Sequence, residues 1–412
     1  MPELLNQGIL DIFFKYLDPT KIPSSSSSSR LEGDSDSTAR RAYMAIAGLT
    51  PAGNFTSKRG NAYWANTFLR GWPGLFSWTK FFVQYRLDKP LASSSVLVDH
   101  LTRRCWIDTL SGAWYSISHG DDVQKAMRET EGSVELAAHL WYMDDEVYVE
   151  PIADIPAPTA CLENVLREAR FEDLSRVLSE ASAEDVTKKA LARLGEAVNA
   201  KPKINGIYVG MYIDLVNQLS RQPDHPLRFA LLAAKSIQEV TKALAVACAQ
   251  INKSPIDLAL LEAVEAGFGY IWNCIESTNG FTWVSQAISS GLLIAFLDLG
   301  PHLSKIWQPR LLKIIFDLFR KVIPPYFVYR TVLKSVEGAF KQIEKDPKHL
   351  QRVQADPEAA RVWSDFTALA NERLKALQSH TLLKGKAATC DNMEVRVLFP
   401  CSLHSWYPSV SI

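Results

Sequence analysis

The 412-residue sequence has no excess of charge of either sign, because 45 Lys and Arg residues balance 45 Asp and Glu residues. A general nucleic-acid-binding protein needs a surplus of cations to neutralise phosphates, so the balance argues against that class. Glycine, proline and cysteine are also scarce, at 20, 21 and 6 residues, which excludes collagen-like, low-complexity and disulfide-stapled chains. The hydrophobic share of 47% is that of an ordinary folded protein.

The sequence also lacks the common catalytic and cofactor motifs. It contains no glycine-rich phosphate-binding loop, no G-x-S-x-G nucleophile elbow and no H-E-x-x-H zinc motif. The acidic runs Asp121–Asp122 and Asp144–Glu146, and the isolated His119 and His139, have no partner at catalytic or metal-ligand spacing. We therefore expect solvated acidic loops, structural histidines, no catalytic residue and no cofactor-binding residue.

No hydrophobic run is long enough to predict a membrane span. In the strongest candidate, residues 281–299, serines and a glutamine precede the short apolar run Leu292–Leu297, whereas a bilayer requires about 20 apolar residues. A buried core helix is therefore expected there. No signal peptide is visible, and four of the six cysteines lie in apolar helical patterns. These features favour an intracellular protein with reduced core thiols.

Helical periodicity is what the sequence has in abundance. Apolar residues recur at steps of three to five along most of residues 40–380, and serine, aspartate and proline start signals separate the periodic segments. This pattern predicts roughly fourteen to eighteen helices. No segment is a convincing strand, and only Val395–Phe399 comes near to the alternation that a strand requires.

Several helix boundaries follow from these signals. We expect one helix over about 160–180 and another that continues from Pro226 to Ile251. Ser182 is expected to cap the helix that follows it, since S-A-E-D resembles a capping box. The segment Gly71–Gly74 has the composition of a turn, after which a new helix would begin near Leu75.

Helix pairs recur at intervals of about 40 residues, which is typical of HEAT or armadillo repeats. An irregular helical bundle would give a similar pattern, and that alternative stays open. The predicted organisation comprises an N-terminal helix, a serine-rich linker, a helical-repeat region and an unstructured C-terminal tail. These four parts cover residues 1–20, 21–39, 40–380 and 381–412.

Tryptophan is concentrated in residues 40–150, which contain six of the eleven tryptophans. An aromatic stripe at helical spacing is far more typical of a core than of a cofactor site, so we expect these rings to be buried. They are Trp64, Trp72, Trp78, Trp106, Trp114 and Trp141.

Three strings of this region, Arg70–Trp78, His100–Trp106 and Gly132–Trp141, resemble the all-helical, armadillo-like part of fungal MYND-type zinc-finger proteins. The string KGKAATCDN, which starts at Lys384, is similar to the entry of the MYND finger itself. In that resemblance, Cys390 occupies the position of the first zinc ligand. The family implies a finger that binds protein partners.

The rest of the finger pattern does not follow Cys390. Cys401 and His404 are two further candidate zinc ligands, but a closed structural site needs four. From Met393 onward the sequence departs from the family. We therefore expect a finger that is truncated in this chain, with zinc bound only in another form of the protein that carries a complete finger.

The sequence as a whole predicts a non-enzymatic scaffold that binds a protein partner of unknown identity. One alternative is an enzyme whose acidic and histidine residues come from distant helices, which spacing along the chain cannot reveal. The other is membrane association through Leu292–Leu297 and Leu311–Phe319.

Overall fold

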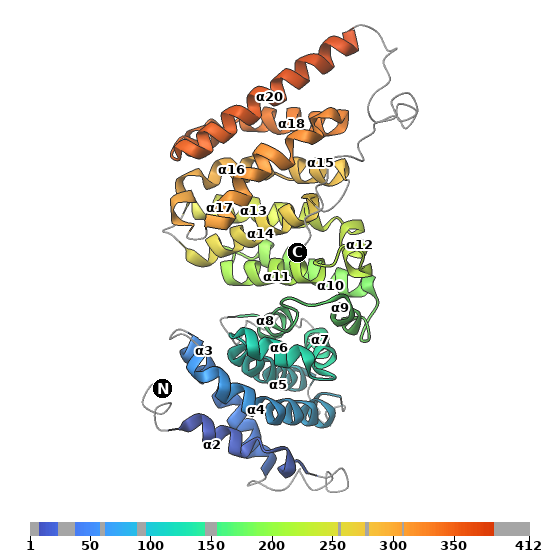
Figure 1. The fold of residues 1–412 in the computed structure, drawn as a ribbon, viewed down its shortest axis with the longest axis vertical. Helices are drawn as coiled ribbons and strands as arrows, with labels where there is room; N and C mark the ends of the chain where they lie inside the picture. The colour runs from blue at the N-terminus through green and yellow to red at the C-terminus, as the bar shows by residue number, and fades with distance from the viewer. Residues whose placement is uncertain are drawn as a thin grey trace, which may run out of the picture. The chain divides into compact units, whose positions relative to one another are not determined.

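The computed structural model describes residues 8–23, 38–57, 62–88, 96–144, 155–253, 257–276, 280–306 and 309–382. Over these ranges the chain is all-α, with nineteen α-helices, a few short 3-10 and π segments, and no strand (Figure 1). The predicted fold class is thus confirmed. Val395–Phe399 and Cys390 lie outside the described residues.

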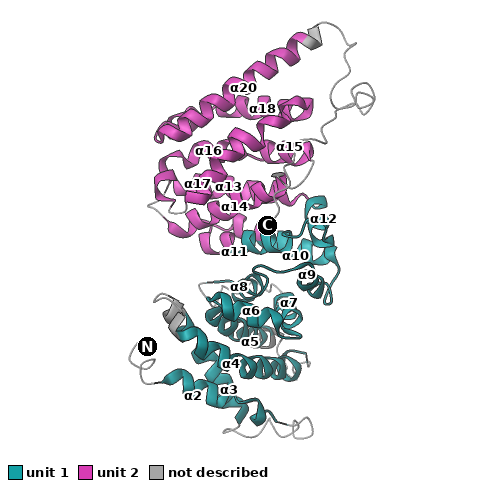
Figure 2. Cartoon of the chain, in the orientation of Figure 1, with its two compact units in different colours: residues 1–193, 211–234 teal, residues 194–210, 235–412 magenta. Residues whose placement is uncertain are grey.

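The chain divides into two compact units (Figure 2). Unit 1 consists of Met1–Arg193 and Met211–Ala234, and unit 2 of Leu194–Gly210 and Lys235–Ile412. Two helices, α10 (Ala183–Asn199) and α11 (Gly206–Leu219), contribute residues to both units.

Unit 1 is built on α3 and α5, which pack against each other. Helix α2 lies on α3 and α4, while α8 packs on α5 and α7. Besides the parts of α10 and α11, the helical segments of unit 1 are α2 (Ile9–Tyr16), η1 (Pro19–Lys21), α3 (Thr38–Ser57), α4 (Ala62–Phe82), η3 (Val83–Leu87), α5 (Val96–Ile117), α6 (Asp121–Glu129), α7 (Ser133–Met143), α8 (Ala157–Val165), α9 (Phe171–Val177) and α12 (Pro226–Ala233).

In unit 2, helices that are three apart along the chain pack side by side: α13 on α16, α16 on α19, α14 on α17, and α15 on α18 (Figure 1). The helical segments that follow α12 are α13 (Ser236–Ile251), α14 (Leu258–Glu276), α15 (Phe281–Ser289), α16 (Leu292–Leu299), η4 (Gly300–Lys305), α17 (Pro309–Asp317), η5 (Leu318–Val322), η6 (Pro324–Val328), α18 (Arg330–Ile343), α19 (Lys348–Val353) and α20 (Pro357–Leu382).

Tryptophans form much of the core of unit 1, as predicted. The rings of Trp78, Trp114 and Trp141 are fully buried, and Trp72 is nearly so, whereas Trp64 and Trp106 are only half-buried. Two of these indole N–H groups have side-chain partners: that of Trp114 donates to the Thr79 hydroxyl at 3.0 Å. That of Trp72 donates to a threonine hydroxyl on the turn after α6. These bonds offset the cost of burying the polar end of the ring.

Two helices that were predicted to be continuous are each broken into two. The segment 160–180 forms α8 and α9, with Glu168 between them at φ 61°. The helix predicted from Pro226 forms α12 and α13, with Lys235 between them at φ 62°. A residue with positive φ ends a right-handed helix. Apolar periodicity does not detect such a break when both halves still present their apolar faces to the core.

The core helix predicted over 281–299 is likewise two helices, α15 and α16, separated by Gly291 at φ 107°. Both halves bury most of their apolar side chains. Among the described helices, α14 alone is long and apolar enough to span a bilayer, and 56% of its window Leu258–Ile275 is buried. The α15–α16 pair passes the same length and composition test only as a span bent by 59°.

The predicted turn at Gly71–Gly74 is wrong, because α4 runs through it without interruption. The two glycines instead let α2 approach closely. A Cβ on Gly71 would lie 2.1 Å from the ring of Phe14, and one on Gly74 would lie 2.2 Å from the carbonyl oxygen of Leu17. Glycine is therefore required here by helix packing, not by a turn.

The predicted cap at Ser182 is confirmed. Its hydroxyl accepts a hydrogen bond from the backbone N–H of Asp185 at 3.1 Å and donates to the Asp185 carboxylate at 2.7 Å. The pair satisfies a free N–H group in the first turn of α10 and fixes the start of that helix.

Candidate functional site

Two sites that were singled out in the sequence have the roles predicted for them: His119 is a structural histidine, and Asp121–Asp122 is a solvated acidic run. His119 lies between α5 and α6 with its ring edge-on to Tyr115, at 4.9 Å between centroids. Burial, together with the charge of Arg167, lowers the pKa of this histidine, so the ring is neutral near pH 7. Asp121 and Asp122 are exposed in the first turn of α6, where their charge favours the helix N-terminus.

His139 joins three segments of unit 1. Its Nδ1 lies 2.7 Å from a carboxylate oxygen of Glu180, after α9, and its Nε2 lies 3.0 Å from one of Asp88, at the end of η3. Partial burial lowers the pKa of His139, but the hydrogen bonds and charges of the two carboxylates outweigh burial and hold that pKa above 6.5. The protonated ring donates to both carboxylates, so His139 is a structural clamp.

The clamp predicts a pH dependence of stability. Because the folded-state pKa of His139 is raised, the clamp contributes fully below the unfolded pKa of about 6.5 and is lost as pH rises through the folded value. We expect hydrogen exchange in α7 to quicken as the pH rises above about 6.5, after correction for the intrinsic rate. His139→Gln should remove that extra change. An unaltered pH profile in His139→Gln would show that the ring does not act as a clamp.

Asp144 is not in a solvated loop, so that prediction is wrong. Its carboxylate is buried at the end of α7, where Arg193 of α10 lies 2.9 Å away and Arg104 of α5 also binds it. Arg104 reaches Asp108 as well, at 2.9 Å. Burial raises the pKa of Asp108, although the charge and hydrogen bond of Arg104 oppose it. Asp145 and Glu146 lie outside the described residues.

The guanidinium of Arg193 also caps the C-terminal end of α7. It donates to the backbone carbonyls of Trp141 and Asp144 and lies over the Trp141 ring, 5.2 Å from its centroid. The ammonium of Lys189, one turn earlier on α10, donates to the carbonyl of Tyr142. These cations satisfy carbonyl groups that have no partner within the helix. The cluster thus holds α5, α7 and α10 together, which is a structural task.

Buried Glu163 on α8 is another ionisable group of unit 1 with a shifted pKa. Burial raises the pKa of its carboxyl, which Arg167 and Gln218 oppose by hydrogen bonds of 3.2 and 3.5 Å. Perturbed carboxyls of this kind mark catalytic sites only when a cavity admits a substrate. Here the hydrogen bonds of Glu163 join α8 to Arg167 and to Gln218 of α11, which is a structural task.

The structure does not test the predicted zinc ligand, because Cys390, Cys401 and His404 lie outside the described residues. Within the described ranges, no group of three His, Cys, Asp or Glu side chains could hold a metal ion. Burial raises the pKa of the Cys161 and Cys248 thiols well above the usual range, so both behave as core residues.

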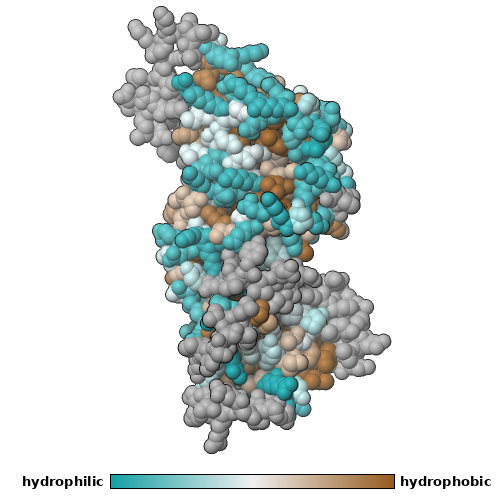
Figure 3. Space-filling view, turned by 180° about the vertical axis from the view of Figure 1, so that it is seen from behind, coloured by the Kyte–Doolittle hydropathy of each residue, from teal (hydrophilic) through white to brown (hydrophobic). Residues whose placement is uncertain are grey.

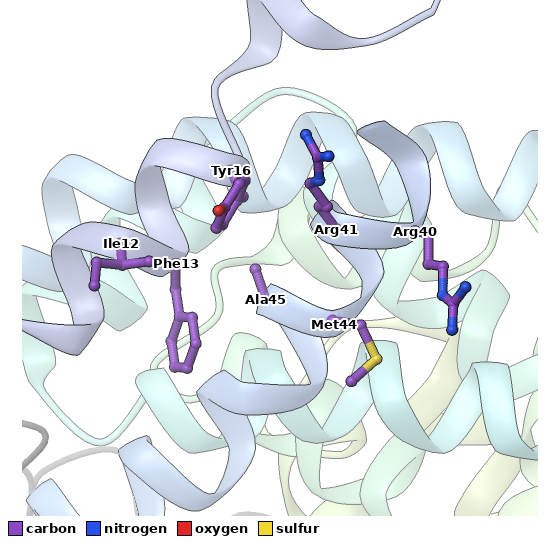
Figure 4. A pocket seen from close by; sticks show the side chains of 7 residues that line it. All are labelled: Ile12, Phe13, Tyr16, Arg40, Arg41, Met44 and Ala45. Carbon is purple, nitrogen blue, oxygen red and sulfur yellow. The ribbon is translucent and has the colours of Figure 1, made fainter. Parts of the chain in front are cut away.

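A groove of about 440 Å³ between α2 and α3 is the candidate binding site (Figure 4). It is lined by Ile12, Phe13, Tyr16, Arg40, Arg41, Met44 and Ala45. Three of its apolar side chains are unusually exposed for their size: Ile12 at 48%, Tyr16 at 38% and Met44 at 60%. A volume of this size lies within the range of about 300–1,000 Å³ that is typical of ligand-binding clefts.

Close packing of α2 holds the walls of this groove. An eight-residue helix is too short to be stable alone, so α2 depends on its contacts with α3 and α4. Gly48 of α3 admits the Phe13 ring, which a Cβ would approach to 2.5 Å. The buried Leu10 and Leu17 anchor the two ends of α2. The shape of the groove is therefore held by the packing of unit 1.

The groove contrasts with most of the visible surface. On the face that Figure 3 shows, hydrophilic residues predominate among those described, and apolar residues occur in small groups. Single exposed apolar residues are normal on a protein surface, but several that line one concavity mark a binding site. Residues 12, 16 and 44 form such a set.

Sequence reasoning missed this groove. Apolar periodicity predicts an N-terminal helix and a helical region after residue 39, but it does not predict how two helices pack against each other. The signal that could have revealed it is that α2 is apolar on more than one side: Phe13, Phe14 and Leu17 face the unit, while Ile12 and Tyr16 remain exposed.

Comparison with protein-family models, with curated proteins and with solved structures finds no match for this chain.

Proposed function

We propose that this protein is a scaffold that binds a partner protein in the groove between α2 and α3. The observation that carries the proposal is the cluster of exposed Ile12, Tyr16 and Met44 that lines one concavity. An apolar floor with a polar rim is the usual anatomy of a protein-binding surface. The polar clusters of unit 1 around His139, Asp144 and Glu163 make their contacts within that unit.

We also propose that the helices form armadillo-like repeats. Packing of helices three apart in unit 2 supports this arrangement, since an armadillo unit contributes two or three helices. Side-chain hydrogen bonds in unit 2 repeatedly join residues 46 to 54 positions apart. In unit 1 the separations of many such bonds are 46 to 55. This spacing is longer than the interval of about 40 residues that the sequence pattern predicts.

One series of contacts illustrates the spacing. The side chain of Asn252, at the end of α13, donates to the carbonyl of Asp298 at the end of α16, at 2.8 Å. The Asp298 carboxylate in turn accepts from His349 of α19, at 2.6 Å. Successive helices of one layer are thus joined at corresponding places, as in a repeat array.

The resemblance to MYND-type proteins supports the same function, because such fingers bind partners. The proposal for this chain is a helical scaffold with a finger truncated after Cys390, which holds zinc only where a complete finger exists. A scaffold of this kind needs no cofactor, no catalytic residue and no membrane span, and we propose that the protein is intracellular.

Photo-crosslinking in the protein's own cellular extract tests the scaffold function. We expect a photoreactive amino acid at position 12 to give discrete adducts with a second protein, because Ile12 is exposed and lines the groove. Met44→Glu should abolish these adducts by placing a charge opposite the apolar wall. Met44 is 60% exposed, so this substitution leaves the fold intact, which circular dichroism can verify.

The matched control is Phe229→Glu, which changes a residue on α12 that is 57% exposed and lies outside the groove. Phe229→Glu should leave the adducts unchanged. Adducts that persist in Met44→Glu, or that are lost equally in both variants, would contradict a binding role for the groove.

A further inference from the structure

Segment η4 of unit 2, which follows α16 directly, buries a histidine beside two cations. The side chain of His302 in this segment is only 9% exposed. Segment η4 packs on α16 and α19, and the approach to α19 is close. A Cβ on Gly300 would lie 2.5 Å from the backbone carbonyl oxygen of Arg352 on α19. The ring is thus held where η4 meets its neighbouring helices.

The hydrogen bonds of Asn252 determine which nitrogen of this ring carries the proton. The amide nitrogen Nδ2 of Asn252, at the end of α13, donates to the carbonyls of Cys248 and Asp298, each at 2.8 Å. An amide nitrogen has two hydrogens, so both are used, and Oδ1 of Asn252 can only accept. Nε2 of His302 lies 3.2 Å from that oxygen and is therefore the donor. The neutral ring is the Nε2–H tautomer.

A second proton can enter this ring only at Nδ1, and that nitrogen faces a cation. The ammonium of Lys305 lies 3.5 Å from Nδ1 of His302 and donates to its lone pair. Protonation would remove this acceptor and place two positive charges side by side. Burial opposes a charged ring, and the charges of Lys305 and Arg352 add to its effect, so the pKa of His302 lies below 6.5.

The other ionisable groups at this junction interact with one another. The carboxylate of Asp298 on α16 accepts from Arg352 and from Nδ1 of His349, each at 2.6 Å. Nε2 of His349 lies 4.0 Å from the Asp346 carboxylate. Burial raises the pKa of the Cys248 thiol on α13, so that group stays neutral. The charge of Asp298 is thus already offset by donors on α19.

We propose that His302 is an acid-sensitive latch that holds η4 against the end of α13. A proton on Nδ1 favours a ring that leaves its buried place for water, because a buried charge without a partner is costly. The bond to Asn252 is then lost, and with it one of the contacts that hold α13 beside α16. The layer of α13, α16 and α19 loosens as a result. This regulation goes beyond the proposed function and does not depend on the groove between α2 and α3.

The latch acts in the direction opposite to the His139 clamp of unit 1. Because the folded-state pKa of His302 is lowered, its contribution to stability is fully present above the unfolded pKa of about 6.5 and is lost as the pH falls through the folded value. The pKa of His139 is raised, so the clamp weakens as the pH rises. Acid therefore loosens the layer in unit 2 while the clamp in unit 1 stays closed.

Histidine-selective NMR of the full-length protein tests the latch directly. Long-range proton–nitrogen spectra of protein with isotope-labelled histidine report the tautomer and the titration of each ring. The signals that disappear in His302→Gln belong to His302. We expect the Nε2–H tautomer at about pH 7.5 and a titration midpoint below 6.5. An Nδ1–H tautomer, or a midpoint at or above 6.5, would overturn the proposal.

Hydrogen exchange measures the consequence for the fold. As the pH falls from about 6.5 to about 5.5, exchange in α13, α16 and α19 should quicken together after correction for the intrinsic rate. The increase should reach up to about tenfold, which is the limit for the uptake of one proton. His302→Gln keeps a donor for Asn252 but has no basic nitrogen, so the extra change should vanish. Asp298 and His349 are the same in both proteins, so their own titration cancels in the comparison. An equal change in His302→Gln would show that the ring is not the latch.

Two lysine variants test the role of the facing cation. Lys305→Gln removes the ammonium at Nδ1 and should move the titration midpoint of His302 upward by roughly half a pH unit. Lys334→Gln removes an exposed charge on α18 and is the matched control, which should leave the midpoint unchanged. Equal midpoints in the two variants would contradict the role of Lys305. These variants keep His302, so they decide the question even if His302→Gln does not fold.

Discussion

Asp298→Ala is expected to lower the free energy of unfolding of unit 2 by about 3–5 kcal/mol, which is typical when one partner of a buried ion pair is removed. The side chain of Asp298 is 2% exposed. Its carboxylate accepts from Arg352 and from His349, each at 2.6 Å. Without the carboxylate, the half-buried guanidinium of Arg352 would lose its acceptor at the end of α16, and the imidazole of His349 would keep the more distant carboxylate of Asp346, at 4.0 Å.

The effect should extend beyond α16, because Asp298 belongs to a longer network. Asn252 donates to the Asp298 carbonyl and accepts, through its Oδ1, from Nε2 of His302 at 3.2 Å. Burial, with the charges of Lys305 and Arg352, lowers the pKa of His302, so a neutral ring makes this bond. Hydrogen exchange should therefore quicken in α13, α16 and α19 together.

Chemical denaturation and hydrogen exchange measure this prediction. Asp298→Asn keeps the size of the side chain without its charge and should cost less than Asp298→Ala. Glu337→Ala removes one partner of an exposed pair with Lys341 in the same unit and should change stability by no more than about 0.5 kcal/mol. An Asp298→Ala variant as stable as Glu337→Ala would show that the network contributes nothing.

The sequence was sufficient for the fold class because helix periodicity and capping are local signals. The cap at Ser182 could be predicted from four adjacent residues, and its bonds are as expected. The break at Lys235 could not be predicted, because lysine is not a residue type that usually adopts a positive φ. Gly71 misled for the opposite reason: glycine is typical of turns, yet here it admits a ring from another helix.

The candidate sites depended on contacts between distant residues, which spacing along the chain does not reveal. Asp144 has the sequence environment of a solvated loop, but Arg193, 49 residues later, carries the guanidinium that makes its burial favourable. The groove needs α2 to lie against α3, although a serine-rich segment separates the two in the chain. The packing of Phe13 at Gly48, together with the contacts of α2 with α4, brings Ile12 and Met44 into the lining of one groove.

Arg193→Ala is expected to destabilise unit 1 by about 3–5 kcal/mol, for reasons that differ from those at Asp298. The guanidinium is 2% exposed, pairs with Asp144 and donates to two backbone carbonyls of the α7 C-terminus. Alanine would leave those carbonyls without donors and Asp144 with Arg104 as its remaining charged partner. It would also leave a cavity beside the Trp141 ring.

Arg193→Lys separates charge from geometry. Lysine keeps a cation near Asp144 but cannot reproduce the planar fork that binds a carboxylate and two carbonyls together, so it should recover only part of the loss. Lys188→Ala, an exposed position on the same helix, is the matched control and should unfold like the unaltered protein. Hydrogen exchange should quicken in α7 and α10 of Arg193→Ala, while α2 and α3 keep their protection. Full recovery by Arg193→Lys would mean that charge alone holds the cluster, and equal stability of Arg193→Ala and Lys188→Ala would mean that the cluster holds nothing.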